Sequence, residues 1–586
     1  MTKNLTRRQW IAAAAALAGD ACSPKRLELP RRAVAPQLQS FPLSAVRLEG
    51  TLGRRLDLCI RNRVFAQDPN KLIEPFRHRT EQTCWQTEFW GKWFLSAAAA
   101  CEYAGDTDRG SRLDHSLRQL IATQSSDGYI GNYAPGSHLK GWDVWGRKYT
   151  LLGLLAAYDL NGDRAPLQAA RRLADHLLRE VGPDGDDIVT LGLYRGMASS
   201  SILQPIVRLY RATHDERYFQ FAQYIVERWS SSKGPQLIEK ANVPVAQRFP
   251  PPKKWWSWEN GQKAYEMMSC YIGLLELYRE TGWAPALDAA RHTYESIRDT
   301  EINVAGSGSA SECWYGGKAL QTETRPRSME TCVSVTWMQF CTHLLAITGE
   351  AHFGDDIERT AYNALAGAMT PDGSSFAQYS PLEGVRSLGE QQCGLDLNCC
   401  VANGPRGMML IPEVAVMLDA QGPAVVLYSS GQWNFVLPSG TPCSLLISTD
   451  YPRDAAAEIR VDPARPESFP LRLRVPQWSR ATKIAVNGAP VAAAQPGTWA
   501  VMERLWKPGD RLRVTFDLRT EQLNIGNRYA MVRGPLALAS DNRLAARAGN
   551  IEMTFPAGHD GAPLCDFASA GNTWDERSRF RTWIPT

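Results

Sequence analysis

The adjacent thiols of Cys399 and Cys400 are the feature of this chain that ordinary packing explains least well. A disulfide between neighbouring cysteines strains the peptide and the S–S torsion, so two thiols placed together suggest a different partner. A soft metal ion is the natural one, because thiolates bind such ions well. Upstream, Glu330 and Cys332 add a carboxylate and a third thiol. These four side chains predict a four-coordinate zinc (Zn2+) site.

Alternatively, these four residues share no function and are unrelated buried cysteine and capping positions. Free cysteine is among the residue types most often buried, and Glu-x-Cys with Cys-Cys is not a standard zinc-finger spacing. Three neighbouring cysteines, Cys313, Cys341 and Cys393, are not expected to be ligands. Cys341 follows Cys332 by nine residues in an apolar helical pattern, which core burial explains.

Four segments carry a family resemblance: 329–336 (METCVSVT), 358–365 (ERTAYNAL), 379–383 (YSPLE) and 398–403 (NCCVAN). In this order and spacing the chain resembles glycoside hydrolase family 127, the β-L-arabinofuranosidase family of zinc-dependent cysteine glycosidases. Weaker matches at 85–92 (WQTEFWGK), 127–131 (DGYIG) and 533–536 (RGPL) extend the resemblance over most of residues 45–540.

The resemblance implies a retaining exo-glycosidase in which a thiolate replaces one of the two usual carboxylates. By motif matching, Cys399 is the nucleophile and Glu312, in 309–313 (SASEC), is the acid/base residue. Zinc would keep the Cys399 thiol deprotonated at neutral pH, where a free thiol with a pKa of about 8.5 is mostly protonated. Glu323 is the rival for the acid/base role. Alternatively, Glu312 is a solvated carboxylate in a loop and has no catalytic role.

One departure from the family bears on the substrate. Its members hold sugar hydroxyls with several histidines, but the matching segments here, 144–149, 196–202 and 261–268, contain none. Arg147, Lys148, Lys263 and Glu266 lie there instead, which suits a more polar or even an acidic sugar, unless these charges lie on the outside of helices. The candidate sugar-binding residues are Lys148, Lys263, Glu266, Tyr379 and Glu88.

The resemblance therefore predicts a β-L-arabinofuranosidase acting on plant-type glycans, with an oligo- or polysaccharide as its partner. A second hypothesis has the same mechanism, but the substrate contains another furanose or a carboxylated sugar. A third, from a different class, is a glycan-binding protein with a structural zinc, because four protein ligands normally close a zinc site. The oligomeric state stays open, with a homodimer among the alternatives.

Composition excludes some partners. The 65 basic and 61 acidic residues leave a net charge of +4 and show no basic stripe, so nucleic acid is not expected as a partner. Nineteen tryptophans suit a protein that stacks on sugar rings, although any single one is more often part of the core.

The N-terminus predicts export. Residues 6–11 (TRRQWI) and the apolar run 12–18 form a twin-arginine pattern within a signal segment of residues 1–30, too short for a membrane span. A periplasmic location follows. Lipoprotein anchoring at Cys22 is a weak alternative, because Asp20 occupies a position that favours a small residue. The other alternative is a frayed start of a cytosolic protein. Since this route carries folded proteins, thirteen cysteines need not imply disulfides.

The remaining pattern indicates two kinds of structure. Apolar helices that end, turn and open a second helix recur at 154–163, 206–215 and 274–283, which predicts an (α/α)6 toroid over 31–415. Short β-rich segments at 425–429, 443–448, 471–475 and 512–517, separated by turn residues, predict a β-sandwich over 416–586. The final stretch, 541–586, fits either a last strand or a wrapped tail.

Overall fold

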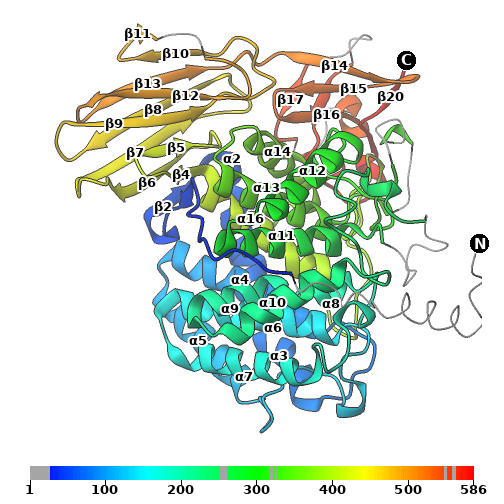
Figure 1. Ribbon diagram of the computed structural model, residues 1–586. Helices are drawn as coiled ribbons and strands as arrows, with labels where there is room; N and C mark the ends of the chain where they lie inside the picture. The colour runs from blue at the N-terminus through cyan, green and yellow to red at the C-terminus, as the bar shows by residue number, and fades with distance from the viewer. Residues whose placement is uncertain are drawn as a thin grey trace, which may run out of the picture.

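The computed structural model describes residues 27–250, 261–316, 321–323, 327–491, 494–546, 551–556 and 562–586. The twin-arginine pattern and Cys22 lie outside these residues. Figure 1 shows a helical body with two β-rich parts above it, one on each side. The predicted combination of a helical toroid and a C-terminal β domain is confirmed.

The helical body is a closed double ring. Its inner helices pack side by side in a circle, with the last against the first: α4 (Thr87–Ala104), α6 (Asp143–Asn161), α9 (Leu203–Thr213), α11 (Ala264–Thr281), α13 (Thr331–Thr348) and α16 (Cys399–Ala415). Each packs against an outer helix: α5 (Thr107–Ile121), α7 (Arg164–Glu180), α10 (Glu216–Trp229), α12 (Ala284–Thr300), α14 (Phe353–Thr360) and α2 (Gly50–Cys59). Shorter helices are α3 (Pro69–His78), α8 (Met197–Ser200) and α15 (Ala366–Ala368).

Local capping explains the hairpin repeat read from the sequence. The inner helices α4, α6, α11 and α13 are each followed by a glycine with positive φ, which closes the helix without a Cβ clash. After α4 and α6 an aspartate then caps the outer helix: Asp106 accepts from Arg109 N and Asp163 accepts from Ala165 N. The inner helices are buried nearly all round, whereas outer helices such as α7 bury one face.

The β-sandwich consists of two sheets. The first has the order β1 (Gln39–Ser40), β4 (Val416–Leu418), β5 (Pro423–Val425), β9 (Glu467–Arg474) and β12 (Trp499–Trp506). The second has the order β11 (Ala489–Pro490), β10 (Lys483–Val486), β13 (Asp510–Thr515), β8 (Ala456–Pro463), β7 (Pro442–Thr449), β6 (Gly431–Val436) and β2 (Val46–Leu48). Strands β1 and β2 come from before the toroid, so the chain's N-terminal part ties the two domains together.

Residues 520–586 form a separate sheet and not a tail of the sandwich. Its order is β14 (Thr520–Ile525), β15 (Arg528–Arg533), β16 (Leu536–Asp541), β18 (Leu564–Asp566) and β17 (Thr554–Phe555), followed off this path by β19 (Phe580–Arg581), β20 (Ile584–Pro585) and β3 (Glu383–Gly384); the short helix α17 (Asn542–Ala546) follows β16. Phe567, Phe580 and Trp583 give it a core of its own. Strands of two or three residues are too short for a sequence pattern to reveal.

The segment 358–365 joins the toroid to both β parts. Buried Glu358 pairs with Arg474 of β9 at 2.7 Å. The amide of Asn363 donates to the carbonyl of Pro535 and accepts from the N–H of Ala537, both at 2.8 Å. This family motif therefore holds the domains together and does not belong to the chemical site.

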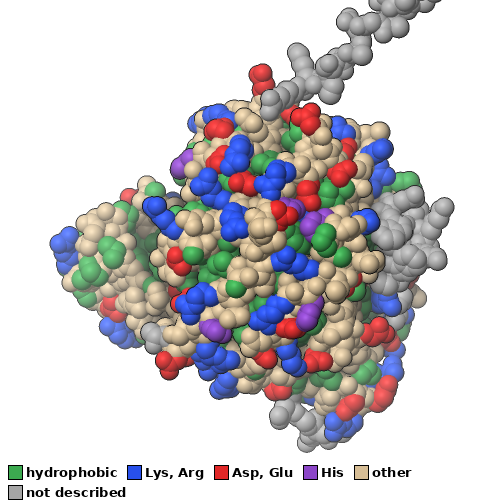
Figure 2. Space-filling view, turned by 90° about the horizontal axis from the view of Figure 1, so that it is seen from below, with side chains coloured by type: hydrophobic (Ala, Val, Ile, Leu, Met, Phe, Trp, Pro, Cys, Tyr) green, Lys and Arg blue, Asp and Glu red, His purple; other side chains and the backbone are tan. Residues whose placement is uncertain are grey.

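The surface carries mixed charge. Figure 2 shows basic and acidic side chains intermixed over the face of the molecule seen from below. Within the described part of the chain, no helix combines the length and apolar character needed to cross a bilayer.

Candidate active site and metal centre

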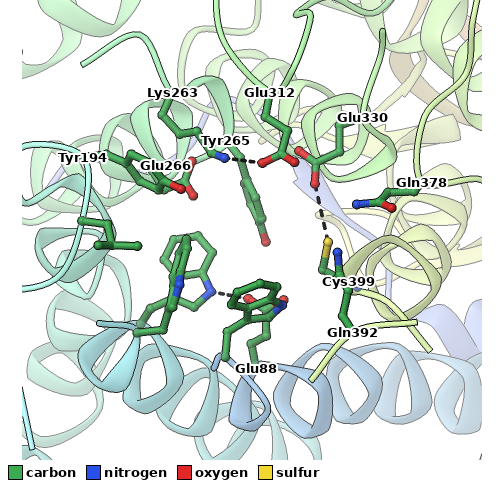
Figure 3. A pocket seen from close by; sticks show the side chains of 14 residues that line it. Glu88, Tyr194, Lys263, Tyr265, Glu266, Glu312, Glu330, Gln378, Gln392 and Cys399 are labelled. Atoms are coloured by element: carbon green, nitrogen blue, oxygen red, sulfur yellow. Dashed lines mark hydrogen bonds and ion pairs between the residues drawn. The ribbon is translucent and has the colours of Figure 1, made fainter. Parts of the chain in front are cut away.

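One cavity lies where the N-terminal ends of the inner helices meet. It has about 820 Å³ of empty volume and is lined by Trp85, Glu88, Trp142, Trp145, Leu193, Tyr194, Lys263, Tyr265, Glu266, Glu312, Glu330, Gln378, Gln392 and Cys399. Figure 3 shows the labelled side chains around a common space. Helix N-termini favour negative groups, so this end of the toroid suits carboxylates and thiolates.

The four predicted metal ligands converge beside this cavity. The sulfurs of Cys399 and Cys400 are 3.8 Å apart, and those of Cys400 and Cys332 are 3.6 Å apart. Oε1 of Glu330 lies 3.5 Å from the Cys399 sulfur and 3.7 Å from the Cys400 sulfur. All four ligand atoms lie within 4.8 Å of one another, so the convergence predicted from the spacing is observed.

Capping explains why the cysteine pair stands where it does. The side chain of Asn398 accepts from the N–H groups of Cys400 and Val401, both at 3.1 Å, so α16 begins at the first cysteine. Glu330 occupies the cap position of α13, which brings its carboxylate to the same ring end. Gln392 accepts from the N–H of Cys399 at 2.9 Å and fixes that backbone further.

The geometry fits a divalent metal ion. Zn–S bonds of about 2.3 Å in a tetrahedron place sulfurs about 3.8 Å apart, as observed here. Oε2 of Glu330 is buried and has no hydrogen-bond partner within the part of the chain that the structure describes. Burial, with Glu312 and Cys332 nearby, raises the pKa of Glu330 well above its usual value. A cation would relieve this crowding of acidic groups.

The other described cysteines lie outside the cluster. Cys341 is fully buried in α13, as expected, and no described cysteine is in a disulfide. Cys313 is buried beside Glu312, and Cys393 lies in the loop next to Gln392. Neither belongs to the group of four that converges.

Glu312 is held by two partners. Its carboxylate pairs with the ammonium of Lys263 and accepts a hydrogen bond from the hydroxyl of Tyr379. Its backbone has a φ of +66°, and its carbonyl accepts from the N–H of Ala264 at 2.9 Å, so the loop is anchored to the start of α11. Glu323 lines a different hollow, with Glu383 and Trp583. The cavity therefore contains Glu312 and not its rival.

Not every candidate sugar-binding residue reaches the cavity. Glu88, Lys263 and Glu266 line it. Tyr379 is not among the lining residues, but its hydroxyl contacts two of them, donating to Glu312 and accepting from Gln378. Lys148 is not among the lining residues: its ammonium lies 4.1 Å from the ring centre of Trp145 and 5.0 Å from that of Tyr149, and burial lowers its pKa to about 7.

Sequence reasoning missed the aromatic lining. Trp142, Trp145, Tyr194 and Tyr265 were not singled out, and Trp85 appeared only inside a motif. Most of them could have been found from their position in the sequence, because they lie at or near the start of an inner helix or in the loop before it. Trp145 donates to Glu88, whose other oxygen accepts from Lys92 at 2.7 Å.

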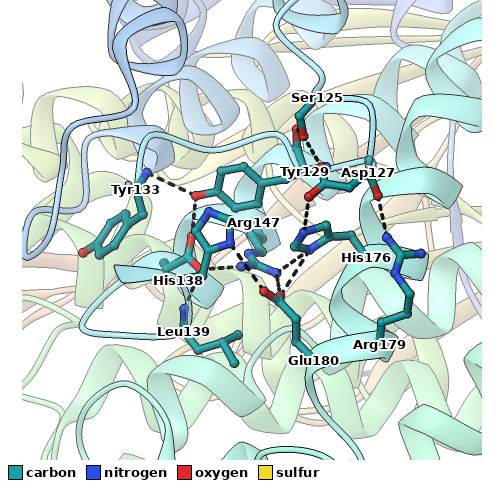
Figure 4. A network of polar contacts seen from close by, with 12 residues as sticks. Ser125, Asp127, Tyr129, Tyr133, His138, Leu139, Arg147, His176, Arg179 and Glu180 are labelled. Atoms are coloured by element: carbon teal, nitrogen blue, oxygen red, sulfur yellow. Dashed lines mark hydrogen bonds and ion pairs between the residues drawn. The ribbon is translucent and has the colours of Figure 1, made fainter. Parts of the chain in front are cut away.

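A second group of possible ligands is a structural network. His138, His176 and Glu180 lie close enough to hold an ion. However, Nη1 of Arg147 lies 2.5 Å from Glu180 Oε2 and 3.3 Å from His176 Nδ1, and Nη2 of Arg147 lies 2.6 Å from Asp143. Figure 4 shows the guanidinium among these groups. Arg147 supplies the positive charge there, so it lines no sugar site.

Comparison with known proteins decides the family. The model of the GH127 β-L-arabinofuranosidase catalytic domain matches residues 48–413, and that of the GH127 middle domain matches residues 424–518. The chain belongs to glycoside hydrolase family 127. It is therefore a glycoside hydrolase, and its substrate is a carbohydrate. No curated protein matches it by sequence.

Solved structures agree on the fold. The GH127 β-L-arabinofuranosidase of Geobacillus stearothermophilus T6 superposes with a TM-score of 0.75 at 18% identity, covering 92% of this chain and 99% of that one. A second structure, a GH127 β-arabinofuranosidase, gives a TM-score of 0.76 at 18% identity, covering 94% and 98%. For a GH127 member, the cluster of Glu330, Cys332, Cys399 and Cys400 is a possible metal site.

Removing one ligand should release the metal. We expect purified protein to carry about one zinc per chain and Cys332→Ala to carry less than about a tenth of that, because three remaining ligands bind far more weakly. Elemental analysis by mass spectrometry measures the content. Cys341→Ala is the matched control, since it removes a buried thiol from the same helix outside the cluster. Full zinc in Cys332→Ala would show that the ion binds elsewhere.

Proposed function

We propose that the chain is a retaining exo-glycosidase that removes β-L-arabinofuranose from plant-type glycans. The observation that carries the proposal is one cavity lined by both Cys399 and Glu312, with three further acidic ligands around the cysteine. The aromatic lining suits the apolar face of a sugar ring. The family supports the arabinofuranoside as the substrate.

In the proposed mechanism, the sulfur of Cys399 attacks the anomeric carbon while Glu312 gives its proton to the leaving oxygen. The C–O bond breaks as the C–S bond forms. Water then attacks the same carbon, Glu312 takes its proton, and the C–S electron pair returns to the sulfur. Two displacements retain the configuration. A bound zinc would keep the free thiol ionised between turnovers.

The charges of the cavity do not favour a carboxylated sugar. That alternative depended on cations near the sugar, but Arg147 and Lys148 do not line the cavity, and Lys263 is paired with Glu312. We therefore expect the neutral arabinofuranoside to be the better substrate.

A panel of 4-nitrophenyl furanosides tests this function, with zinc measured on the same sample. We expect the β-L-arabinofuranoside to be hydrolysed and its configuration to be retained by NMR of the first product. No turnover at full zinc occupancy would favour the glycan-binding alternative, which four protein ligands around one ion also support. Turnover of a carboxylated furanoside alone would replace the proposed sugar.

We also propose that the enzyme is exported to the periplasm, from the twin-arginine pattern in residues 6–18. Cell fractionation of the full chain tests this, because replacing Arg7 and Arg8 should retain the protein in the cytoplasm. A homodimer stays a prediction that light scattering would test.

A further inference from the structure

We propose that Glu266 selects the sugar, by accepting hydrogen bonds from hydroxyls of an uncharged ring and by disfavouring a ring that carries a carboxylate. The inference rests on the proposed function only in taking this cavity as the sugar site. The histidines expected of the family are missing from the segment 261–268 that contains this residue.

The carboxylate of Glu266 lines the cavity, and one of its oxygens has no donor among the described residues. It lies in the first turn of α11 and is only 2% exposed, yet Oε2 is buried without a hydrogen-bond partner among the described residues. In Figure 3 its carboxylate points into the cavity beside Tyr194. A buried carboxyl oxygen without a donor is costly, so the donor is expected from a ligand.

The other charged groups of the cavity are already paired. Lys263 binds Glu312, and Glu88 is held by Lys92 and Trp145. Glu330 belongs to the metal cluster. Lys263 is the one lysine among the described lining residues, so a carboxylate on the sugar would find no free ammonium there. Hydroxyl groups, in contrast, donate readily to a carboxylate.

The protonation of Glu266 gives the site a pH dependence. Burial raises its pKa to about 7; Lys263 and Lys148 oppose this rise, and Glu312 adds to it. Glu330, at the start of α13, also interacts with it electrostatically, as do Tyr194 and Cys270. The ionised carboxylate, present above about pH 7, accepts from two hydroxyls and repels an anion. The protonated form has one acceptor fewer and no charge.

Binding of two matched thioglycosides tests the inference. The probes are methyl 1-thio-β-L-arabinofuranoside, whose sulfur link resists turnover, and the same glycoside with its hydroxymethyl group oxidised to a carboxylate. Titration calorimetry of the zinc-loaded protein at pH 8 should show at least about tenfold tighter binding of the neutral probe, because charged hydrogen bonds contribute strongly. Glu266→Gln should reduce that preference at least about tenfold.

Two controls make the result specific. Glu280→Gln, at the far end of α11, should leave the preference unchanged. If Glu266→Gln does not fold, the wild-type protein still tests the idea, since its affinity for the neutral probe should rise from pH 6 to pH 8. No binding of the neutral probe, a wild-type preference for the carboxylate, or an unchanged preference in Glu266→Gln would overturn the inference. If the protein bound the neutral probe selectively but hydrolysed no arabinofuranoside, the proposed hydrolysis would be refuted and the inference about Glu266 would stand.

Discussion

Cys399→Ser is expected to lose at least about 1,000-fold in kcat while keeping its fold, because an alcohol at this position is neither as nucleophilic nor as easily ionised as a thiol. Cys399 is the member of the cysteine cluster that lines the cavity, whereas Cys400 and Cys332 lie behind it. Steady-state hydrolysis of 4-nitrophenyl β-L-arabinofuranoside measures the loss, and circular dichroism checks the fold.

The control separates lost chemistry from lost structure. Cys443→Ser removes a buried thiol from β7, far along the chain from the cluster, and should retain wild-type activity. Zinc content should also be measured, because a serine ligand weakens the site. If Cys399→Ser kept more than about a tenth of the wild-type kcat, the sulfur would not be the nucleophile, and the zinc would be structural.

Glu312→Gln should show the second-largest effect, and the effect should depend on the leaving group. A glycoside with a poor leaving group, such as the methyl glycoside, needs a proton on its oxygen and should slow by about 100- to 10,000-fold. A dinitrophenyl glycoside needs little protonation, so its first step should slow far less. Pre-steady-state kinetics with both substrates measures the difference.

Glu323→Gln is the matched control for this prediction, since Glu323 lies in a separate hollow. It should behave as the wild type on both substrates. An equal loss on the two substrates in Glu312→Gln would mean that Glu312 positions the sugar and does not transfer a proton. Azide should restore turnover of the activated substrate if the missing function is that of a base.

Features that depend on residues close together along the chain could be predicted from the sequence. The pair Cys399–Cys400 and the spacing of Glu330 from Cys332 predicted ligands that the folded chain brings within 4.8 Å. The apolar helices that end, turn and open a second helix predicted paired helices, because turns such as the one at Gly162 and Asp163 depend on residues close along the chain. The alternating strands of the sandwich were visible for the same reason.

Other features depended on contacts between distant segments. Lys148 lies within α6, whereas Lys263 is the cap residue before α11, and of the two only Lys263 reaches the cavity. One residue of rotation on a helix turns a side chain by about 100°, which a single sequence does not resolve. The separate sheet within residues 520–586 was missed because its last strands, β17 to β20, have only two or three residues, and one of them, β19, pairs with β3 from a loop far upstream.

The sequence by itself determined the candidate ligand set, the helix and strand types and the family resemblance, since these follow from residue chemistry and local capping. Only the tertiary structure decided which charges face the sugar. It paired Lys263 with Glu312, placed Arg147 in a network with Glu180, and left one oxygen of Glu266 without a donor. The physical reason is that a charged side chain acts on a ligand only where no closer group neutralises its charge. The groups that neutralise Lys263 and Arg147 come from segments distant in the sequence, the Glu312 loop and α7.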